Sequence, residues 1–287
     1  MTHITNNTLL RGIDCRGGFF FIRGERMFVK TVKIKSAAVI IAVLSLVLVC
    51  CICAGSVAAV RTAAAKKELP IYSVERGDNK VAISFDAAWG NEQTAALIDI
   101  LGRYGVKTTF FVVGSWVDKY PESVKALDAA GHEVMNHSNT HPHLTRLDVA
   151  GIEKEINLCA AKIESVIGKR PDLLRPPYGD YNDTVIKTIR RLGVYPIQWD
   201  VDSLDWKGIS AERITERVLG GVKDGSIVLF HNGGEHTAEA LPAVIEGLQS
   251  KGYEIVPVSQ LILRENYMID HTGRQKPEQY VNSVSES

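Results

Sequence analysis

The chain has 287 residues, of which 45% are hydrophobic, and its 33 basic residues balance its 33 acidic ones. A balanced charge creates no overall field that would attract nucleic acid or an acidic partner, so we expect no nucleic-acid binding. The length suits one large domain or two small ones.

The first element in chain order is an apolar segment, residues 36–60, that contains no charged residue. It is long enough to cross about 30 Å of bilayer core as a helix, and it lacks the polar face that a core helix of a globular protein would show. We therefore expect a transmembrane signal anchor at 36–60, preceded by a cytoplasmic segment at 1–35 and followed by a linker at 61–78. Basic residues flank the anchor on both sides, so they favour a cytoplasmic N-terminus only modestly.

This organisation predicts a single-pass protein of the cell membrane whose remaining part lies outside the cytoplasm. An alternative start at Met27 would leave the anchor intact. Only one cysteine, Cys159, lies beyond the anchor and the linker, so no disulfide is expected there.

After the linker, segments with strand character alternate with segments of helical periodicity. The expected strands cover 80–85, 107–114, 132–137, 172–177, 194–202, 226–231 and 253–258. The expected helices cover 92–105, 121–131, 148–168, 182–193, 210–222 and 239–252. Such alternation predicts an α/β fold with a parallel sheet covered by helices, and about seven units favour a closed or nearly closed barrel over 79–264. Residues 265–287 are polar and aperiodic, and we predict a flexible tail.

Charged and titratable residues lie at or just after the ends of five of the expected strands. They are Asp86, then His137 and His141, then Arg175, then Asp202 and Asp205 beside Trp206, and finally His231. In such a barrel the carboxyl ends of the strands share one face, where the chemistry sits. His137 and His141 are four residues apart, and on a helical turn both imidazoles would point the same way, which suits a divalent metal. Exposed loop histidines are the alternative.

Five short segments carry a resemblance: "SFDAAWG", "HSNTH", "RPPYG", "DSLDW" and "LFH", in this order. The stretch from Val81 to Leu263 that contains them resembles the polysaccharide deacetylase family, carbohydrate esterase family 4, also called the NodB-homology domain. The resemblance implies a distorted (β/α)7 barrel after the N-terminal transmembrane helix.

The resemblance also implies a role for each matching residue. Asp86 matches the general base, Arg175 the arginine that orients it, His137 and His141 two metal ligands, His231 the general acid, and Asp205 the carboxylate that tunes this acid. The backbone amide of Tyr178 matches an oxyanion donor, and Trp206 and Leu229 match walls of the pocket for the acetyl methyl.

The residue types agree with these roles. Amide hydrolysis needs an activated water, a place for the oxyanion and a proton for the nitrogen. Arg175 beside Asp86 would keep the carboxylate ionised, and a carboxylate partner would let His231 carry a proton near neutral pH. The alternatives are a surface salt bridge for Arg175, a helix or turn cap for Asp202 and Asp205, and a core position for His231.

Ala87 departs from the family pattern, which usually has a second aspartate, the third metal ligand, at this position. Alanine cannot coordinate a metal, and two imidazoles hold a divalent ion weakly. The expected cofactor is a divalent metal, zinc before cobalt or manganese, with weak or absent binding as the alternative. The motif resembles that of sporulation-linked, PdaB-like members, which implies peptidoglycan as the substrate class.

Three functional hypotheses follow. The first is a membrane-anchored, outward-facing hydrolase that removes N-acetyl groups from peptidoglycan or a related N-acetylated polysaccharide, in the cell wall or the spore cortex. The second is a degenerate domain that binds glycan without hydrolysis. The third, hydrolysis of a small cyclic amide, does not need a membrane anchor. We expect Trp89, Trp116 and Trp199 to serve packing, and His132, His143, His236 and His271 to lie outside the site.

Overall fold

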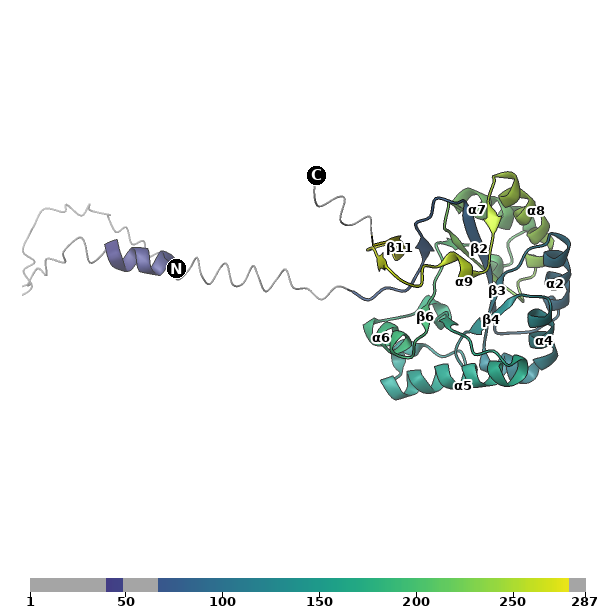
Figure 1. Ribbon diagram of the computed structural model, residues 1–287, viewed down its shortest axis with the longest axis horizontal. Coiled ribbons are helices and arrows are strands. Elements are labelled where there is room, and N and C mark those ends of the chain that lie inside the picture. Colours follow the sequence, from purple (N-terminus) through teal and green to yellow (C-terminus); the bar gives the residue numbers. More distant parts are fainter. Residues whose placement is uncertain (1–39, 49–66, 279–287) are drawn as a thin grey trace, which may run out of the picture. The chain divides into compact units, whose positions relative to one another are not determined.

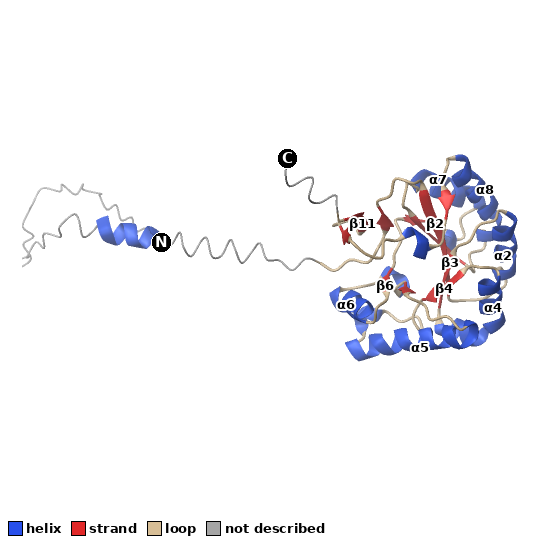
Figure 2. Cartoon of the chain, in the orientation of Figure 1, coloured by secondary structure: helices blue, strands red, loops and turns tan. Residues whose placement is uncertain are grey.

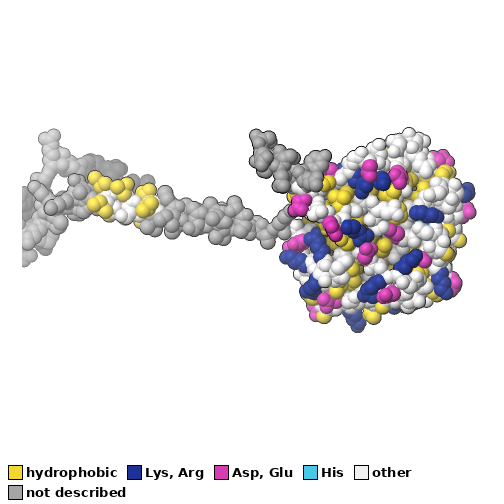
Figure 3. Space-filling model, in the orientation of Figure 1, with side chains coloured by type: hydrophobic (Ala, Val, Ile, Leu, Met, Phe, Trp, Pro, Cys, Tyr) yellow, Lys and Arg dark blue, Asp and Glu magenta, His cyan; other side chains and the backbone are white. Residues whose placement is uncertain are grey.

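The structure, a computed structural model, describes residues 40–48 and 67–278. The chain divides into two units, Met1–Ala65 and Lys66–Ser287. In the first unit, residues 40–48 form a helix with exposed apolar side chains (yellow in Figure 3). No helix in the described ranges combines the length and the apolarity that crossing a bilayer requires. The segment 1–35 and most of the expected anchor at 36–60 lie outside the described residues.

The second unit is built on a curled parallel sheet with the strand order β6-β5-β4-β3-β2-β8-β7 (Figure 1). The strands are β2 (Lys80–Ala87), β3 (Thr109–Val112), β4 (Glu133–Asn136), β5 (Leu173–Leu174), β6 (Tyr195–Pro196), β7 (Val201–Asp202) and β8 (Ile227–His231). A short strand, β9 (Glu254–Ile255), pairs with the beginning of β2. The predicted α/β fold with a parallel sheet is confirmed.

The curled sheet is consistent with the predicted distorted barrel, although its two edge strands do not pair with each other. The expected single strand at 194–202 is divided into β6 and β7, and no ladder among the described residues joins these two strands. On its free side β6 contacts Ile71 instead, because the Ile71 N–H donates to the Pro196 carbonyl oxygen at 2.9 Å and the Gln198 N–H donates to the Ile71 carbonyl oxygen at 2.7 Å. The result is a curled sheet that stays open between β6 and β7.

Helices surround the outer side of the sheet, as Figure 2 shows. They are α2 (Thr94–Arg103), α3 (Gly114–Lys119), α4 (Pro121–Ala129), α5 (Val149–Ile167), α6 (Asp183–Arg191), α7 (Ala211–Gly221) and α8 (Thr237–Ser250). The short α9 (Val258–Leu261) packs instead in a second core cluster with Ala82 and Phe111. The side chains of Asp148, Asn182 and Ser210 accept hydrogen bonds from the first turns of α5, α6 and α7, which is the standard N-cap contact. The six predicted helices are therefore present, whereas the short α3 and α9 were not predicted.

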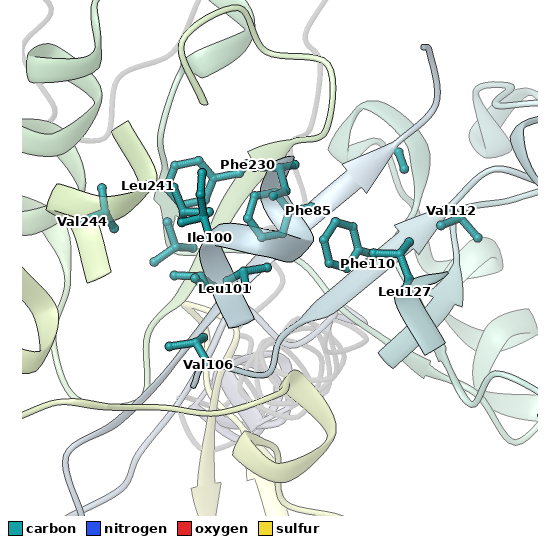
Figure 4. Packing of buried hydrophobic residues seen from close by; sticks show 14 of the residues in the cluster. Phe85, Ile100, Leu101, Val106, Phe110, Val112, Leu127, Phe230, Leu241 and Val244 are labelled. Atoms are coloured by element: carbon teal, nitrogen blue, oxygen red, sulfur yellow. The ribbon is translucent and has the colours of Figure 1, made fainter. Parts of the chain in front are cut away.

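The main core lies between the sheet and this helical layer (Figure 4). The rings of Phe85 on β2 and Phe110 on β3 stack with centroids 4.8 Å apart, and Phe230 on β8 lies 5.6 Å from Phe85. Because side chains alternate along a strand, Phe85 and Ala87 belong to this core, while Asp86 faces the opposite side of the sheet, where the strand ends converge.

The segments that flank the sheet in sequence are folded against it. The short strand β1 (Ser73–Val74) pairs with β11 (Arg274–Pro277), which pairs with β10 (Tyr267–Ile269). The predicted linker at 61–78 is thus part of the domain from residue 67 onward, and the flexible tail predicted for 265–287 is wrong for residues 265–278. These strands are too short to produce a periodic pattern, and long-range pairing holds them in place.

Candidate active site

The strand ends line one cleft with a volume of about 910 Å³. The predicted site residues in its lining are Asp86, His137, His141, Tyr178, Asp205, Trp206, Leu229 and His231. Arg175 lies beneath the cleft and is 0% exposed. The structure therefore brings all the predicted site residues together, while their catalytic roles stay predictions.

Asp86 and Arg175 form a buried ion pair at the end of β2. Arg175 donates from Nη1 to Asp86 Oδ1 at 2.7 Å and from Nη2 to Ser84 Oγ at 2.8 Å, and its guanidinium lies 4.2 Å from the ring centre of Phe111. Burial by itself would raise the pKa of Asp86, but the charge and hydrogen bond of Arg175, together with His137 and His231, outweigh it and lower this pKa. Asp86 is therefore ionised at neutral pH, and the alternative of a surface salt bridge for Arg175 is wrong.

His137 faces the same carboxylate. Its Nδ1 lies 2.7 Å from the carbonyl oxygen of Arg175. Since a carbonyl can only accept, Nδ1 carries the proton and Nε2 keeps a free lone pair. This Nε2 lies 3.4 Å from Asp86 Oδ2. Two electron-pair donors that face each other this closely favour a cation or a proton between them.

His141 is the second imidazole, and its ring centre lies 4.9 Å from that of His137. Burial lowers the pKa of His137 and lowers that of His141 to about 4, so both rings are neutral at physiological pH, as metal ligation requires. The Nδ1 atom of His141 is buried and has no hydrogen-bond partner among the residues that the structure describes. Both rings are thus available as ligands.

The segment between the two histidines is a loop rather than the helical turn we expected. Ser138 and His141 both have positive φ angles, 66° and 59°, which are uncommon for residues other than glycine. Glu155 on α5 stabilises the loop, because its carboxylate accepts from the backbone N–H groups of Asn139 and Thr140 at 2.9 and 2.8 Å and from the Thr140 hydroxyl at 2.9 Å. Sequence analysis missed Glu155, since only the fold brings α5 against this loop.

His231 and Asp205 form a second charged pair. The carboxylate of Asp205 accepts from the Nδ1 and the backbone N–H of His231, each at 2.7 Å, and from the Thr237 hydroxyl at 2.7 Å. Burial opposes protonation of His231, but Asp205, together with the charges of Asp86 and Asp202, outweighs it and raises the pKa of His231 above its ordinary value. Asp205 therefore does not act as the alternative cap, whereas Asp202 does accept from the backbone of Leu204.

Aromatic side chains surround the mouth of the cleft. Tyr178 and Trp206 are each 57% exposed and Trp89 is 67% exposed, with the Trp89 ring centre 4.9 Å from that of His141. The expectation that Trp89 serves packing is wrong, because it stands in solvent at the cleft, whereas Trp116 is 2% exposed in the core as expected. His143, which we placed outside the site, stacks on Tyr178 at 4.2 Å.

The donor set fits a divalent metal only in part. Among the described residues, no group of three or more His, Cys, Asp or Glu side chains is arranged to hold a metal, and catalytic zinc usually has three protein ligands. Ala87 is 1% exposed and belongs to the core, while Ala88 lines the cleft. His137 and His141 would therefore hold a divalent ion weakly.

The sequence is similar to those of known proteins. The family model described as polysaccharide deacetylase matches residues 73–197. The chain is 39% identical over 189 residues to the peptidoglycan-N-acetylmuramic acid deacetylase PdaC of Bacillus subtilis, a match that covers 66% of this chain and 40% of that protein. It is 34% identical over 214 residues to a chitooligosaccharide deacetylase of Bradyrhizobium sp., covering 67% of this chain and 98% of that protein.

Two of the similar solved structures bear on whether the chain is active. The structure of a CE4 family pseudoenzyme from Bacillus anthracis matches with a TM-score of 0.65 and 32% identity, covering 67% of this chain and 68% of that chain. A mutant of that pseudoenzyme with restored enzymatic activity matches with the same TM-score of 0.65. The chain is therefore similar both to a pseudoenzyme and to a variant of it that has enzymatic activity.

Proposed function

This chain belongs to the polysaccharide deacetylase family, and on that premise we propose that it is a metal-dependent hydrolase that removes N-acetyl groups from the amino sugars of peptidoglycan or a related polysaccharide. One observation carries the proposal. Asp86, held ionised by Arg175, and His231, paired with Asp205, occupy matching positions on the neighbouring strands β2 and β8 and line the same cleft. A base and an acid with opposite pKa shifts are what amide hydrolysis needs.

Asp86 supplies the basic side of the reaction. Its lowered pKa keeps it able to accept a proton from an attacking water at neutral pH. Arg175 fixes the position of one carboxylate oxygen and leaves Oδ2 directed towards His137. The buried pair therefore orients the base and keeps it ionised, because the guanidinium has no exposed surface and cannot swing away.

His231 supplies the acidic side. The raised pKa of its imidazole allows it to hold a proton near neutral pH and to donate it to the departing amine. Asp205 and Thr237 fix the ring through the hydrogen bonds described above. Tyr178 has a φ of 61°, the kind of unusual backbone conformation that collects at functional sites, and it is the residue whose amide would bind the oxyanion.

A divalent ion, when bound by His137 and His141, would lower the pKa of its water and polarise the acetyl carbonyl. Zinc is the proposed ion, with cobalt and manganese as alternatives. The deficit of protein ligands favours a second candidate function, in which the domain binds glycan in the same cleft without hydrolysis.

Acetate release distinguishes these two functions. The full-length chain is incubated with N-acetylglucosamine oligomers and with peptidoglycan, with and without added zinc, cobalt or manganese, beside Asp86→Asn as the control. We expect acetate in the presence of metal, and a loss of about a hundredfold or more in the control. Glycan binding without acetate under every metal condition would favour the second function.

The missing ligand is tested by two matched variants, Ala87→Asp and Ala88→Asp. The resemblance points to position 87, whereas the structure favours position 88, because Ala88 lines the cleft and Ala87 is buried in the core. We expect at least a tenfold gain in zinc affinity, measured by calorimetry, from the carboxylate that reaches the imidazoles. No gain from either variant would show that the absent carboxylate does not limit metal binding.

We further propose that the protein is anchored in the cell membrane by a single span at 36–60, with the cleft outside the cytoplasm, and that it acts during sporulation. The uncharged sequence of this segment supports the anchor. Protease treatment of intact cells should digest the domain and leave the N-terminus protected. Recovery of the full chain in the cytosolic fraction would contradict this arrangement.

A further inference from the structure

The lining of the cleft is rich in acidic residues. Carboxylates contribute five of its lining residues, and none of the lining residues is lysine or arginine. The five are Asp86, Glu92, Asp202, Asp205 and Glu235. Arg175 balances Asp86 from below, and His231 balances Asp205. The carboxylates of Glu92, Asp202 and Glu235 remain, so the open part of the cleft is electronegative.

Few basic groups face this surface. The imidazole of His236 does so, with its Nε2 4.0 Å from Glu235 Oε1, whereas three lysine and arginine side chains near the cleft contact other groups. Lys207 lies over the ring of Trp206 at 4.9 Å, and Lys119 lies over Tyr120 at 5.0 Å. Arg217 donates to the backbone carbonyl of Asp202 at 2.6 Å rather than to its carboxylate. None of these three cations is in the lining of the cleft.

Glu92 and Glu235 stand on two loops that pack side by side. Gln93 donates to the carbonyl oxygen of Gly234 at 2.8 Å, and Asn232 donates to that of Gly90 at 3.0 Å. These contacts join the loops after β2 and β8 into one wall of the cleft. Both glutamates are exposed on this wall, so a sugar that enters the cleft meets their charges.

Exposed aromatic rings show where such a sugar would lie. Trp89, on the same loop as Glu92, and Trp206, which follows β7, both line the cleft and are 67% and 57% exposed. Large exposed aromatic side chains are costly in solvent and mark binding surfaces. The acidic wall and these rings therefore act on the same bound molecule.

We propose, building on the deacetylase function above, that this cleft selects N-acetylated sugars without an acidic substituent. N-acetylglucosamine positions would then be bound in preference to N-acetylmuramic acid positions, whose 3-O-lactyl group ends in a free carboxylate or continues into a peptide. The selection depends on charge repulsion, because a lactyl carboxylate beside this wall meets the charges of Glu92 and Glu235, and no lysine or arginine is among the residues that line the cleft. Like charges within several ångströms at a protein surface change affinity about tenfold at low salt.

The test isolates charge from size. The full-length chain is titrated with chitotetraose, with a tetrasaccharide that alternates N-acetylglucosamine and N-acetylmuramic acid, and with the methyl ester of that tetrasaccharide, following tryptophan fluorescence. We expect the ester to bind about tenfold more tightly than the free acid at low salt. This ratio should fall to about twofold in the Glu92→Gln/Glu235→Gln variant and in about 0.5 M salt. Glu122→Gln, which removes an exposed carboxylate outside the cleft, should keep the wild-type ratio.

Equal affinity for the acid and the ester in the wild-type protein would overturn the proposal, and so would a ratio that survives in the double variant. Acetate release, assigned to each sugar by mass spectrometry, separates this proposal from the function on which it rests. Equal release from both sugars would overturn the selectivity and leave the hydrolase standing. A preserved affinity ratio without any acetate would support the selectivity and refute the hydrolase.

Discussion

Arg175→Met removes the only guanidinium that contacts Asp86 in the described part of the chain. Methionine fills much of the same space against Phe111, so the main loss is electrostatic. The guanidinium makes hydrogen bonds of 2.7 Å to Asp86, 2.8 Å to Ser84 and 3.3 Å to the carbonyl oxygen of Gln198. Removing one partner of such a buried pair costs about 3–5 kcal/mol of unfolding free energy.

The pH dependence of this loss identifies its cause. In the wild-type protein the lowered pKa of Asp86 contributes stability that is present above the pKa of the unfolded chain and is lost as pH falls through the lowered value. Without Arg175, burial raises the pKa of Asp86 instead. The stability difference between variant and wild type should therefore be largest near pH 7 and shrink towards pH 5, where the buried carboxyl group is protonated more easily.

Urea unfolding of the full-length chain at both pH values measures this difference. Asp86→Asn/Arg175→Met is the second variant, and it should recover a large part of the lost stability because no buried charge is left. Arg175→Lys keeps the charge and allows a folded comparison. A loss that is equal at both pH values, and that Asp86→Asn does not recover, would refute the reasoning.

Two further predictions concern the acid and the loop of the site. Asp205→Asn should lower the pKa of His231, so the alkaline limb of the pH–rate profile for acetate release should move to lower pH. The rate at pH 7 should fall about a hundredfold. An alkaline limb that does not move would exclude His231 as the acid. Glu155→Ala should leave the donors of loop 138–141 without an acceptor, which costs about 1–3 kcal/mol, and should weaken zinc binding measured by calorimetry. The control, Glu153→Ala, removes a surface ion pair on the same helix and should change the unfolding free energy and the zinc affinity only by a small amount. Equal zinc affinities in the two variants would contradict a positioning role for Glu155.

Much of the secondary structure followed from local patterns. The helix of 19 residues at Val149–Ile167 has a clear apolar periodicity, begins at the cap Asp148 and ends at Gly168 with a φ of 70°. The predicted helix boundaries therefore lie within a few residues of the observed ones. The errors concern segments without such local signals, since the hairpin formed by β10 and β11 exists only because β11 pairs with β1, about 200 residues earlier in the chain.

The residues of the site also fall into those that local sequence patterns predict and those that they do not. Asp86, Arg175 and His231 could be predicted because each lies at the end of a strand pattern, and parallel strands must end at a common edge. Trp89 could not be placed, since a tryptophan after a strand packs inward or stands in solvent according to neighbours that are remote in sequence. Glu155 and Thr237 carry no signal of their own, because an ordinary helical residue becomes a hydrogen-bond partner only when its helix docks.

The sequence by itself determined the order of strands and helices, the residue types at each strand end and the alanine where a ligand is expected, because each depends on residues that are close together along the chain. Only the tertiary structure decided that the sheet stays open, that the charge of Asp86 is balanced from below by a fully buried arginine, and that the cleft has an acidic wall. Burial and electrostatic balance depend on distances between segments that are far apart in the chain, and a linear pattern does not contain those distances.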